Sequence, residues 1–136
     1  MHSVREIDFP QNTAENGNLI VMEGLTHIPF SIARVVVVLA PVGAVRGQHA
    51  HKVCTQLLTC PVGEIEVTCH DGLQSETFLL NRPNRGLLIE PGIWAQQFYR
   101  ASSAVLTVLC DQPYDSRDYI RDFEEFKAYK DARRQR

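Results

Sequence analysis

Two histidines, His49 and His51, stand one residue apart in the stretch that runs from Gly43 to Gly63. Glycines on either side, and the turn at 61–63, give this stretch the defined ends of a β-strand. Side chains alternate between the two faces of a strand, so both imidazoles are expected to point into the same space. Such a pair can bind a divalent metal ion or transfer protons.

The metal interpretation has a partial template in the sequence. The spacing resembles the cupin signature, in which a glycine, five residues, His-x-His, three or four residues, a glutamate and a later glycine follow one another. The glycines fit, but Thr55 and Gln56 occupy the positions where the acid would fall. A second cupin motif around 91–94 should add a histidine, and Ala95 stands there instead. Two imidazoles alone leave an ion mostly to water, so we expect no tightly bound metal.

Acid–base catalysis is the second interpretation of the pair. The unperturbed pKa of histidine, ~6.5, lies near neutral pH, so an imidazole can take up a proton and return it. Two cations at that separation repel, which predicts that the pair shares one proton and offers one base and one donor. The alternative is that the two rings only make hydrogen bonds inside a polar barrel.

The bulk composition describes the domain that must position these histidines. With 136 residues and 44% hydrophobic composition, we expect one domain over residues 1–136. A net charge of -2 argues against nucleic-acid binding, and the sequence contains neither a signal peptide nor a membrane-spanning run, so we expect a cytoplasmic protein. The four cysteines are expected to be buried, reduced thiols: Cys54, Cys60, Cys69 and Cys110.

Short strands separated by turn residues predict an all-β barrel or sandwich up to about residue 111. The expected strands are 4–9, 18–23, 30–40, 49–60, 64–69, 75–80, 86–90, 94–100 and 104–111. Asn16-Gly17 and Asp71-Gly72 predict tight hairpin turns, because these residues tolerate positive φ. After Pro113, a cap at Asp115 or Ser116 and apolar residues at helical spacing predict a C-terminal amphipathic helix and tail over about 115–136.

The run Arg34-Val35-Val36-Val37-Val38-Leu39 does not alternate between polar and apolar residues. A strand of this kind needs cover on both faces. In so short a chain a second subunit is a natural cover, so the sequence predicts a homodimer with this strand near the interface.

Four segments of the chain resemble one known family in the family's order. Residues 46–52, Arg-Gly-Gln-His-Ala-His-Lys, closely resemble the signature of the nucleotide-sugar 3,4-ketoisomerases, and 27–35, 86–94 and 114–123 also look like family segments. The resemblance implies a cupin-type jelly roll or β-barrel, a homodimer, a dTDP-4-keto-6-deoxyhexose substrate and no cofactor. It also implies that a transaminase uses the 3-keto product to make a 3-amino-3,6-dideoxyhexose.

Moving a carbonyl from C4 to C3 requires removal of the C3 proton, stabilisation of an enediolate and return of a proton at C4. We assign His51 as the base and His49 as the group that donates to, or orients, the developing oxyanion. Arg46 is expected to neutralise the enediolate or a phosphate, or to tie down its own loop.

Five further residues are candidates for holding the substrate. Gln56 stands where a cupin has a metal ligand and can donate to a sugar oxygen or fill the barrel interior. Trp94 can stack on the sugar or base, or belong to the core. Arg34, Arg85 and Arg100 are alternatives for holding the diphosphate, since guanidinium groups match phosphate oxygens, and the sequence does not rank them.

The chain departs from the family pattern at two places. Val36 and Val37 stand where the family usually has tyrosines, and Ala95 stands where it has histidine. These losses leave open the stereochemistry at C4 and two alternative functions. One is a non-catalytic nucleotide-sugar binding cupin, and the other is an epimerase acting on a related nucleotide sugar.

Overall fold

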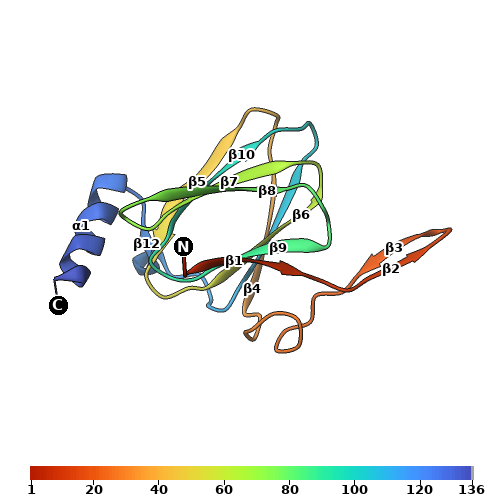
Figure 1. Ribbon diagram of the computed structural model, residues 1–136, viewed down its shortest axis with the longest axis horizontal. Helices are drawn as coiled ribbons and strands as arrows, with labels where there is room; N and C mark the ends of the chain where they lie inside the picture. The colour runs from red at the N-terminus through yellow and green to blue at the C-terminus, as the bar shows by residue number, and fades with distance from the viewer. Residues whose placement is uncertain (136) are drawn as a thin grey trace.

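The computed structural model describes residues 1–135, which form two five-stranded antiparallel sheets that face each other as a flattened barrel (Figure 1). The first sheet has the spatial order β1 (Val4–Asp8), β9 (Arg85–Ile89), β6 (Gln56–Val62), β11 (Val105–Cys110) and β4 (Arg34–Leu39). The second has the order β12 (Tyr119–Ile120), β5 (Val45–His51), β10 (Trp94–Tyr99), β7 (Ile65–His70) and β8 (Ser75–Leu80).

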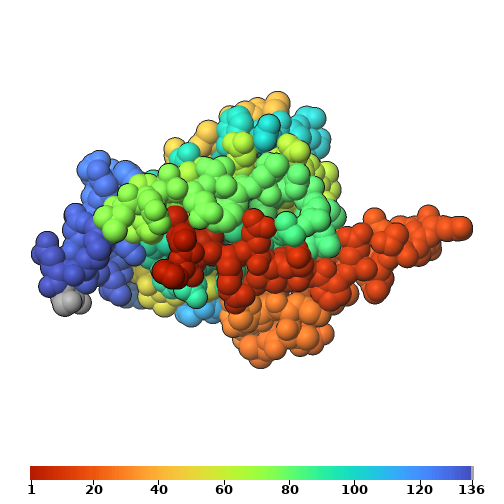
Figure 2. Space-filling model, in the orientation of Figure 1, coloured from red at the N-terminus to blue at the C-terminus, as the bar shows by residue number. Residues whose placement is uncertain are grey.

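Two elements extend from the barrel at opposite ends of the molecule. The hairpin β2 (Gln11–Ala14) and β3 (Gly17–Ile20) projects well away from the sheets (Figures 1 and 2). The helix α1 (Phe123–Arg134) lies at the other end and packs against β12 and β5. No helix within residues 1–135 is long and apolar enough to cross a membrane.

The main core lies between the two sheets. It includes Leu58, Leu87 and Leu106 from the first sheet and Ile65 and Val67 from the second, each at most 1% exposed. All four cysteines are buried and free, as predicted. At about 25 cal/mol per Å² of buried apolar area, closure of this interior is the main favourable term that holds the sheets together.

The prediction of an all-β chain with a C-terminal helix is confirmed, but β2 and β12 lie outside the expected strands and several expected elements have other bounds. The predicted strand 49–60 is two strands, because the chain passes from the second sheet to the first between β5 and β6. The helix begins at Phe123 rather than near 115, and its N-cap is Asp122. Asp115 instead caps the short 3₁₀ turn η1 (Ser116–Asp118), whose chain continues into β12.

The strand β4 lies at the edge of the first sheet, and its side chains alternate in exposure. Val36 and Val38 are half-buried toward the core, whereas Val35, Val37 and Leu39 are 57%, 58% and 76% exposed. Residues 1–135 therefore leave one face of the apolar run uncovered.

Candidate active site

The barrel interior contains a cavity bordered by β4, at the edge of the first sheet, and by β5 of the second. Its volume is about 170 Å³, and both strands contribute to its walls. Five strands contribute polar or charged side chains, which are Arg34, Arg46, His49, Gln56, Gln97 and Tyr119. The cavity therefore combines a hydrophobic wall from β4 and β11 with a polar wall from β5 and β12.

His49 and His51 face the same interior space, as the strand spacing predicted. Their ring centroids are 5.0 Å apart with the planes nearly perpendicular. Ala50, between them, points to the opposite face of the sheet and is fully buried beside α1. The alternation along β5 thus places two imidazoles together and separates them from the helix.

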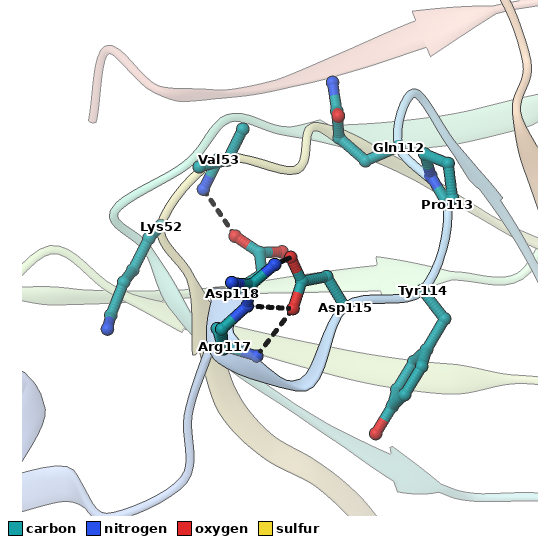
Figure 3. Close-up of a pocket in the computed structure, with 8 residues that line it drawn as sticks. All are labelled: Lys52, Val53, Gln112, Pro113, Tyr114, Asp115, Arg117 and Asp118. Carbon is teal, nitrogen blue, oxygen red and sulfur yellow. Dashed lines mark hydrogen bonds and ion pairs between the residues drawn. The ribbon is translucent and has the colours of Figure 1, made fainter.

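His51 is held by a carboxylate that is distant in the sequence. Its Nδ1 lies 2.7 Å from Oδ2 of Asp118. The other oxygen of Asp118 accepts a hydrogen bond from the backbone N–H group of Val53 at 2.6 Å (Figure 3). It also accepts one from the backbone N–H group of Cys54 at 3.4 Å. These contacts fix the carboxylate from one side and the imidazole from the other, so the ring orientation is set before any substrate arrives.

The same contacts decide which nitrogen of His51 carries the proton. Burial raises the pKa of Asp118, but the hydrogen bonds from His51 and Val53 outweigh it and hold that pKa below its usual value. An ionised carboxylate only accepts, so Nδ1 of His51 is the donor and Nε2 carries the lone pair. Nε2 is buried and has no hydrogen-bond partner within residues 1–135.

His49 has the same tautomer for a different reason. Its Nδ1 lies 2.9 Å from the carbonyl oxygen of Gly47, which can only accept. Burial, followed by the nearby charge of His51 when that is protonated, lowers the pKa of His49 to about 4. The Nε2 atom of His49 is therefore also an acceptor at neutral pH.

This arrangement differs from the predicted pair that shares one proton. Burial also lowers the pKa of His51, against the hydrogen bond and charge of Asp118, which raise it. The prediction took account only of repulsion between two charged imidazoles, whereas burial also disfavours protonation of a single imidazole. Both imidazoles are neutral at pH 7, and neither directs an N–H group into the cavity.

A β-bulge brings Arg46 to the same face as His49. The register between β5 and β10 shifts between Ala95 and Gln96, and Gly47 and Gln48 have φ values of 85° and 55°. Strict alternation would place residues 46 and 49 on opposite faces, and the extra residue reverses this. A side chain at Gly47 would also meet Gln97 at 2.7 Å, so the bulge requires glycine there.

Arg34 and Gln56 complete the polar part of the cavity. Nη2 of Arg34 donates to the hydroxyl of Tyr119 at 3.3 Å and to Sγ of Cys110 at 3.8 Å. Nε2 of Gln56 donates to the same sulfur at 3.6 Å. Nε of Arg34 is buried and has no partner among residues 1–135, so this guanidinium group retains a donor for a ligand.

The structure does not bring the other predicted binding residues to this cavity. Trp94 lies on the outer face of β10, where its ring contacts Phe123 and Phe126 of α1. Arg85 pairs with Asp8 and Glu6, and Arg100 with Glu64 and Glu66, all on the surface. Their guanidinium groups already have carboxylate partners outside the cavity.

The positions that depart from the family pattern lie on different faces. Val36 lines the cavity, whereas Val37 points to the outer surface. Ala95 is paired with His49 in the strand register and lines the space beside both histidines. The departures at Val36 and Ala95 therefore remove polar groups from the cavity itself.

One group of three possible metal ligands lies close together within the described residues, namely His51, Cys54 and Asp118. Their ligand atoms lie within 4.8 Å of one another. Nδ1 of His51 and Oδ2 of Asp118 are hydrogen-bonded to each other at 2.7 Å. A hydrogen bond with Cys110 raises the pKa of the Cys54 thiol, and burial raises it further. Two of the three ligand atoms are thus already paired with each other, and the raised pKa keeps the third as a protonated thiol, which does not fit a bound ion.

Sequence reasoning missed two residues of the site, Asp118 and Tyr119. Asp118 is 67 positions from His51, and nothing in a strand or helix period links them. Tyr119 fits the helical spacing that continues to Phe126, so the pattern alone places it on the packing face of the predicted helix. Only the likeness of segment 114–123 to the ketoisomerase pattern marked this region.

The chain is similar to known proteins over most of its length. The model of the family described as "FdtA: WxcM-like, C-terminal" matches residues 2–131. A TDP-4-oxo-6-deoxy-alpha-D-glucose-3,4-oxoisomerase from Aneurinibacillus thermoaerophilus is 36% identical over 124 residues, which cover 90% of this chain and 89% of the relative.

Solved structures agree with this relationship. The sugar 3,4-ketoisomerase QdtA from Thermoanaerobacterium thermosaccharolyticum, in complex with TDP, superimposes with a TM-score of 0.94 at 31% identity and covers 98% of both chains. A 3,4-ketoisomerase from Helicobacter canadensis gives a TM-score of 0.91 at 33% identity, covering 94% of this chain and 97% of that one.

Proposed function

The chain belongs to the FdtA family, and we propose that it is an isomerase that moves the keto group of a dTDP-4-keto-6-deoxyhexose from C4 to C3. The observation that carries the proposal is the buried, unpartnered Nε2 of His51, in the interior space that this residue shares with His49, while Asp118 holds the proton on Nδ1. A neutral imidazole fixed in this tautomer is a general base at neutral pH. The cupin-type barrel and the names of the relatives support the same substrate class.

The first chemical step uses this base. Nε2 of His51 takes the hydrogen at C3 as a proton, the electrons of that bond form a C3–C4 double bond, and the negative charge moves to the former keto oxygen. A proton must later be added at C4, and the C3 hydroxyl group must lose its proton. Because the charge stays on carbon and oxygen within one enediolate, we propose that the reaction uses no cofactor.

The substrate-binding roles of Arg34, Arg46 and Gln56 belong to the same proposal. Arg34 and Arg46 line the cavity from β4 and β5, so a substrate in the opening meets positive charge on both sides. We assign them to the enediolate and the diphosphate, for which guanidinium groups are suited. Gln56 can donate to a sugar oxygen from within the barrel. The packing of Trp94 against α1 does not support a stacking role.

Incubation with dTDP-4-keto-6-deoxyglucose, followed by ¹H NMR, tests the proposal. We expect conversion to the 3-keto isomer by the wild type and loss of at least ~10³-fold in rate for His51→Asn, which removes the base but keeps a polar side chain of similar size.

Equal rates for the two proteins, or no turnover by either, would contradict the proposed function. Deuterium that enters from solvent at C5 alone would indicate epimerisation. Tight dTDP binding by calorimetry without turnover would indicate a binding protein.

The chemistry of the product indicates the reaction that follows. A 3-keto sugar presents an electrophilic carbon to an amine, so we propose that an aminotransferase consumes it to give a 3-amino-3,6-dideoxyhexose. Detection of the amino sugar when such an enzyme is added to the assay, but not when His51→Asn replaces the wild type, checks this order.

We also propose that the protein is a homodimer in which β4 lies near the interface. Its outer face exposes Val35, Val37 and Leu39, which is a continuous apolar surface at the edge of a sheet. The projecting hairpin β2–β3 makes no sheet contact with the barrel, so it too is available to a second copy (Figure 2).

Light scattering coupled to size exclusion tests the dimer. We expect twice the chain mass for the wild type and a shift toward the monomer for Val37→Asp. Leu73→Asp is the control, because Leu73 is 73% exposed in a turn far from β4 in the sequence. A monomeric wild type would contradict the proposal.

A further inference from the structure

Isomerisation moves two protons, and the base accounts for only one of them. The hydrogen on C3 must reach C4, and the hydroxyl proton on the C3 oxygen must be replaced by one on the C4 oxygen. The second transfer needs a group that can give a proton to one oxygen and take one from its neighbour. This requirement rests on the proposed function.

Neither imidazole supplies the proton that must be added to the C4 oxygen. Nδ1 of His49 donates to Gly47 and Nδ1 of His51 to Asp118, so the cavity sees only their lone pairs. Guanidinium and amide groups stabilise charge but do not release a proton in this pH range. The thiol of Cys54 donates to the backbone carbonyl of Thr55 at 3.5 Å.

Tyr119 has the geometry of a proton donor. It is half-buried and lines the cavity together with His49 and Arg34. Its ring centroid lies 4.4 Å from that of His51 and 5.0 Å from that of His49. Backbone pairing of β12 with β5, in which Tyr119 stands opposite His51, fixes this position.

The hydroxyl of Tyr119 is also prepared electrostatically. It accepts a hydrogen bond from Nη2 of Arg34 at 3.3 Å, so its own hydrogen is free to point toward a ligand. A fixed guanidinium beside the oxygen stabilises the negative charge that remains once the proton leaves. Within the described cavity lining, it is also the one hydroxyl group.

We propose that Tyr119 is a catalytic residue that exchanges the proton between the two sugar oxygens. After His51 has removed the hydrogen from C3, the O–H bond of Tyr119 breaks and a new O–H bond forms on the negatively charged C4 oxygen. The phenolate, held by Arg34, then takes the proton from the C3 oxygen, and His51 gives up its proton as C4 is protonated. The protein returns to its starting state, and no oxidant or reductant is consumed.

This assignment accounts for one departure from the family pattern. Val36 lines the cavity on β4 but carries no hydroxyl. Tyr119 supplies a hydroxyl to the same cavity from β12, on the opposite wall. The chain therefore contains a phenol at the site even though β4 has none.

Reaction in D₂O, monitored by ¹H NMR, separates the two proton transfers. Exchange of the C3 hydrogen of the substrate reports on His51, and appearance of the 3-keto isomer requires both transfers. For Tyr119→Phe, which keeps the ring, we expect isomer formation to fall by ~10²- to 10⁴-fold while exchange at C3 stays within ~5-fold of the wild type. Tyr129→Phe, on α1 away from the cavity, should change neither rate.

The possible results distinguish this inference from the proposed function. If the wild type neither exchanges nor isomerises, the proposed function fails. If the wild type isomerises and Tyr119→Phe does so equally well, or loses exchange and isomerisation together while still folded, the role of Tyr119 is overturned. Should Tyr119→Phe unfold, a ring-fluorinated tyrosine at 119 replaces it. It should change isomer formation without changing exchange, and an equal effect on both would overturn the inference.

Discussion

The two faces of the β5–β10 strand pair carry opposite functions on one backbone. On the inner face, His49 and His51 stand beside Ala95 in a polar cavity. On the outer face, Ala50 and Trp94 pack against α1 in a small aromatic cluster. Neighbouring residues in the sequence thus belong to different environments, so the identity of a residue says less about its role than the face on which it lies.

The comparison also shows how the reactive face is kept in position. Atoms that face away from the substrate are satisfied: Nδ1 of each histidine has an oxygen partner, and Asp118 has two backbone donors. Atoms that face the cavity, including Nε2 of His51 and Nε of Arg34, have none within residues 1–135. The outer cluster packs the same strands from behind and limits their movement, which is the usual way in which a scaffold holds a catalytic group.

Replacement of Asp118 should have the largest effect on the inner face. In Asp118→Asn, the side-chain oxygen remains with the N–H groups of Val53 and Cys54, so the amide NH₂ turns toward Nδ1 of His51. Nδ1 must then accept, and the proton moves to Nε2, where the base is needed. We expect kcat for isomerisation to fall by ~10²- to 10⁴-fold, by analogy with the tautomer effect in catalytic triads.

The pH profile adds a second measurement to this variant. Burial lowers the pKa of His51 and Asp118 opposes it, so wild-type kcat/KM should be constant above pH ~6.5 and fall as the pH drops through the lowered pKa. Without the carboxylate, the pKa of His51 falls further, so the decrease of kcat/KM on the acid side of the profile moves to lower pH. Asp115→Asn, which affects an exposed carboxylate of the same segment, is the control. An unchanged kcat in Asp118→Asn would show that the dyad is not needed.

Replacement of Phe126 should have the largest effect on the outer face, and it should appear as stability. Phe126 is fully buried, and its ring contacts Trp94 and Phe123. Phe126→Ala is expected to lower the free energy of unfolding by ~3 kcal/mol, because it removes a large side chain and leaves a cavity. Urea unfolding followed by circular dichroism measures this change.

Phe98→Ala is the matched control for this measurement. Phe98 lies on β10 at even spacing from Trp94 but is 39% exposed, so a loss of less than ~1 kcal/mol is expected. Isomerase activity of Phe126→Ala, measured well below its unfolding temperature, should stay within ~5-fold of the wild type. A greater loss of activity than of stability would show that the outer face takes part in the chemistry.

The sequence predicted the parts of this molecule that depend on local patterns. Alternation placed His49 and His51 together, and turn residues and apolar periods predicted the barrel and the helix. Arg46 was assigned through the family resemblance, but its face depends on a bulge that strict alternation does not predict. Asp118 could not be found by spacing, because its contact with His51 closes a loop of 67 residues. The role suggested for Trp94 depended on which face of β10 it occupies, and one apolar stretch does not define that face.

Replacement of Trp94 should have the smallest effect, and it tests the comparison most directly. Trp94→Phe keeps an aromatic ring beside Phe123 and Phe126, so the free energy of unfolding should fall by only ~1 kcal/mol. If the outer face is purely structural, KM and kcat for the dTDP-sugar should both stay within ~2-fold. Ala95→Leu, at the next residue, places a larger side chain beside His49 and should lower kcat/KM by at least ~10-fold through lost space for the substrate. A large rise in KM for Trp94→Phe, with Ala95→Leu unaffected, would assign substrate binding to the helix side and reverse the roles of the two faces.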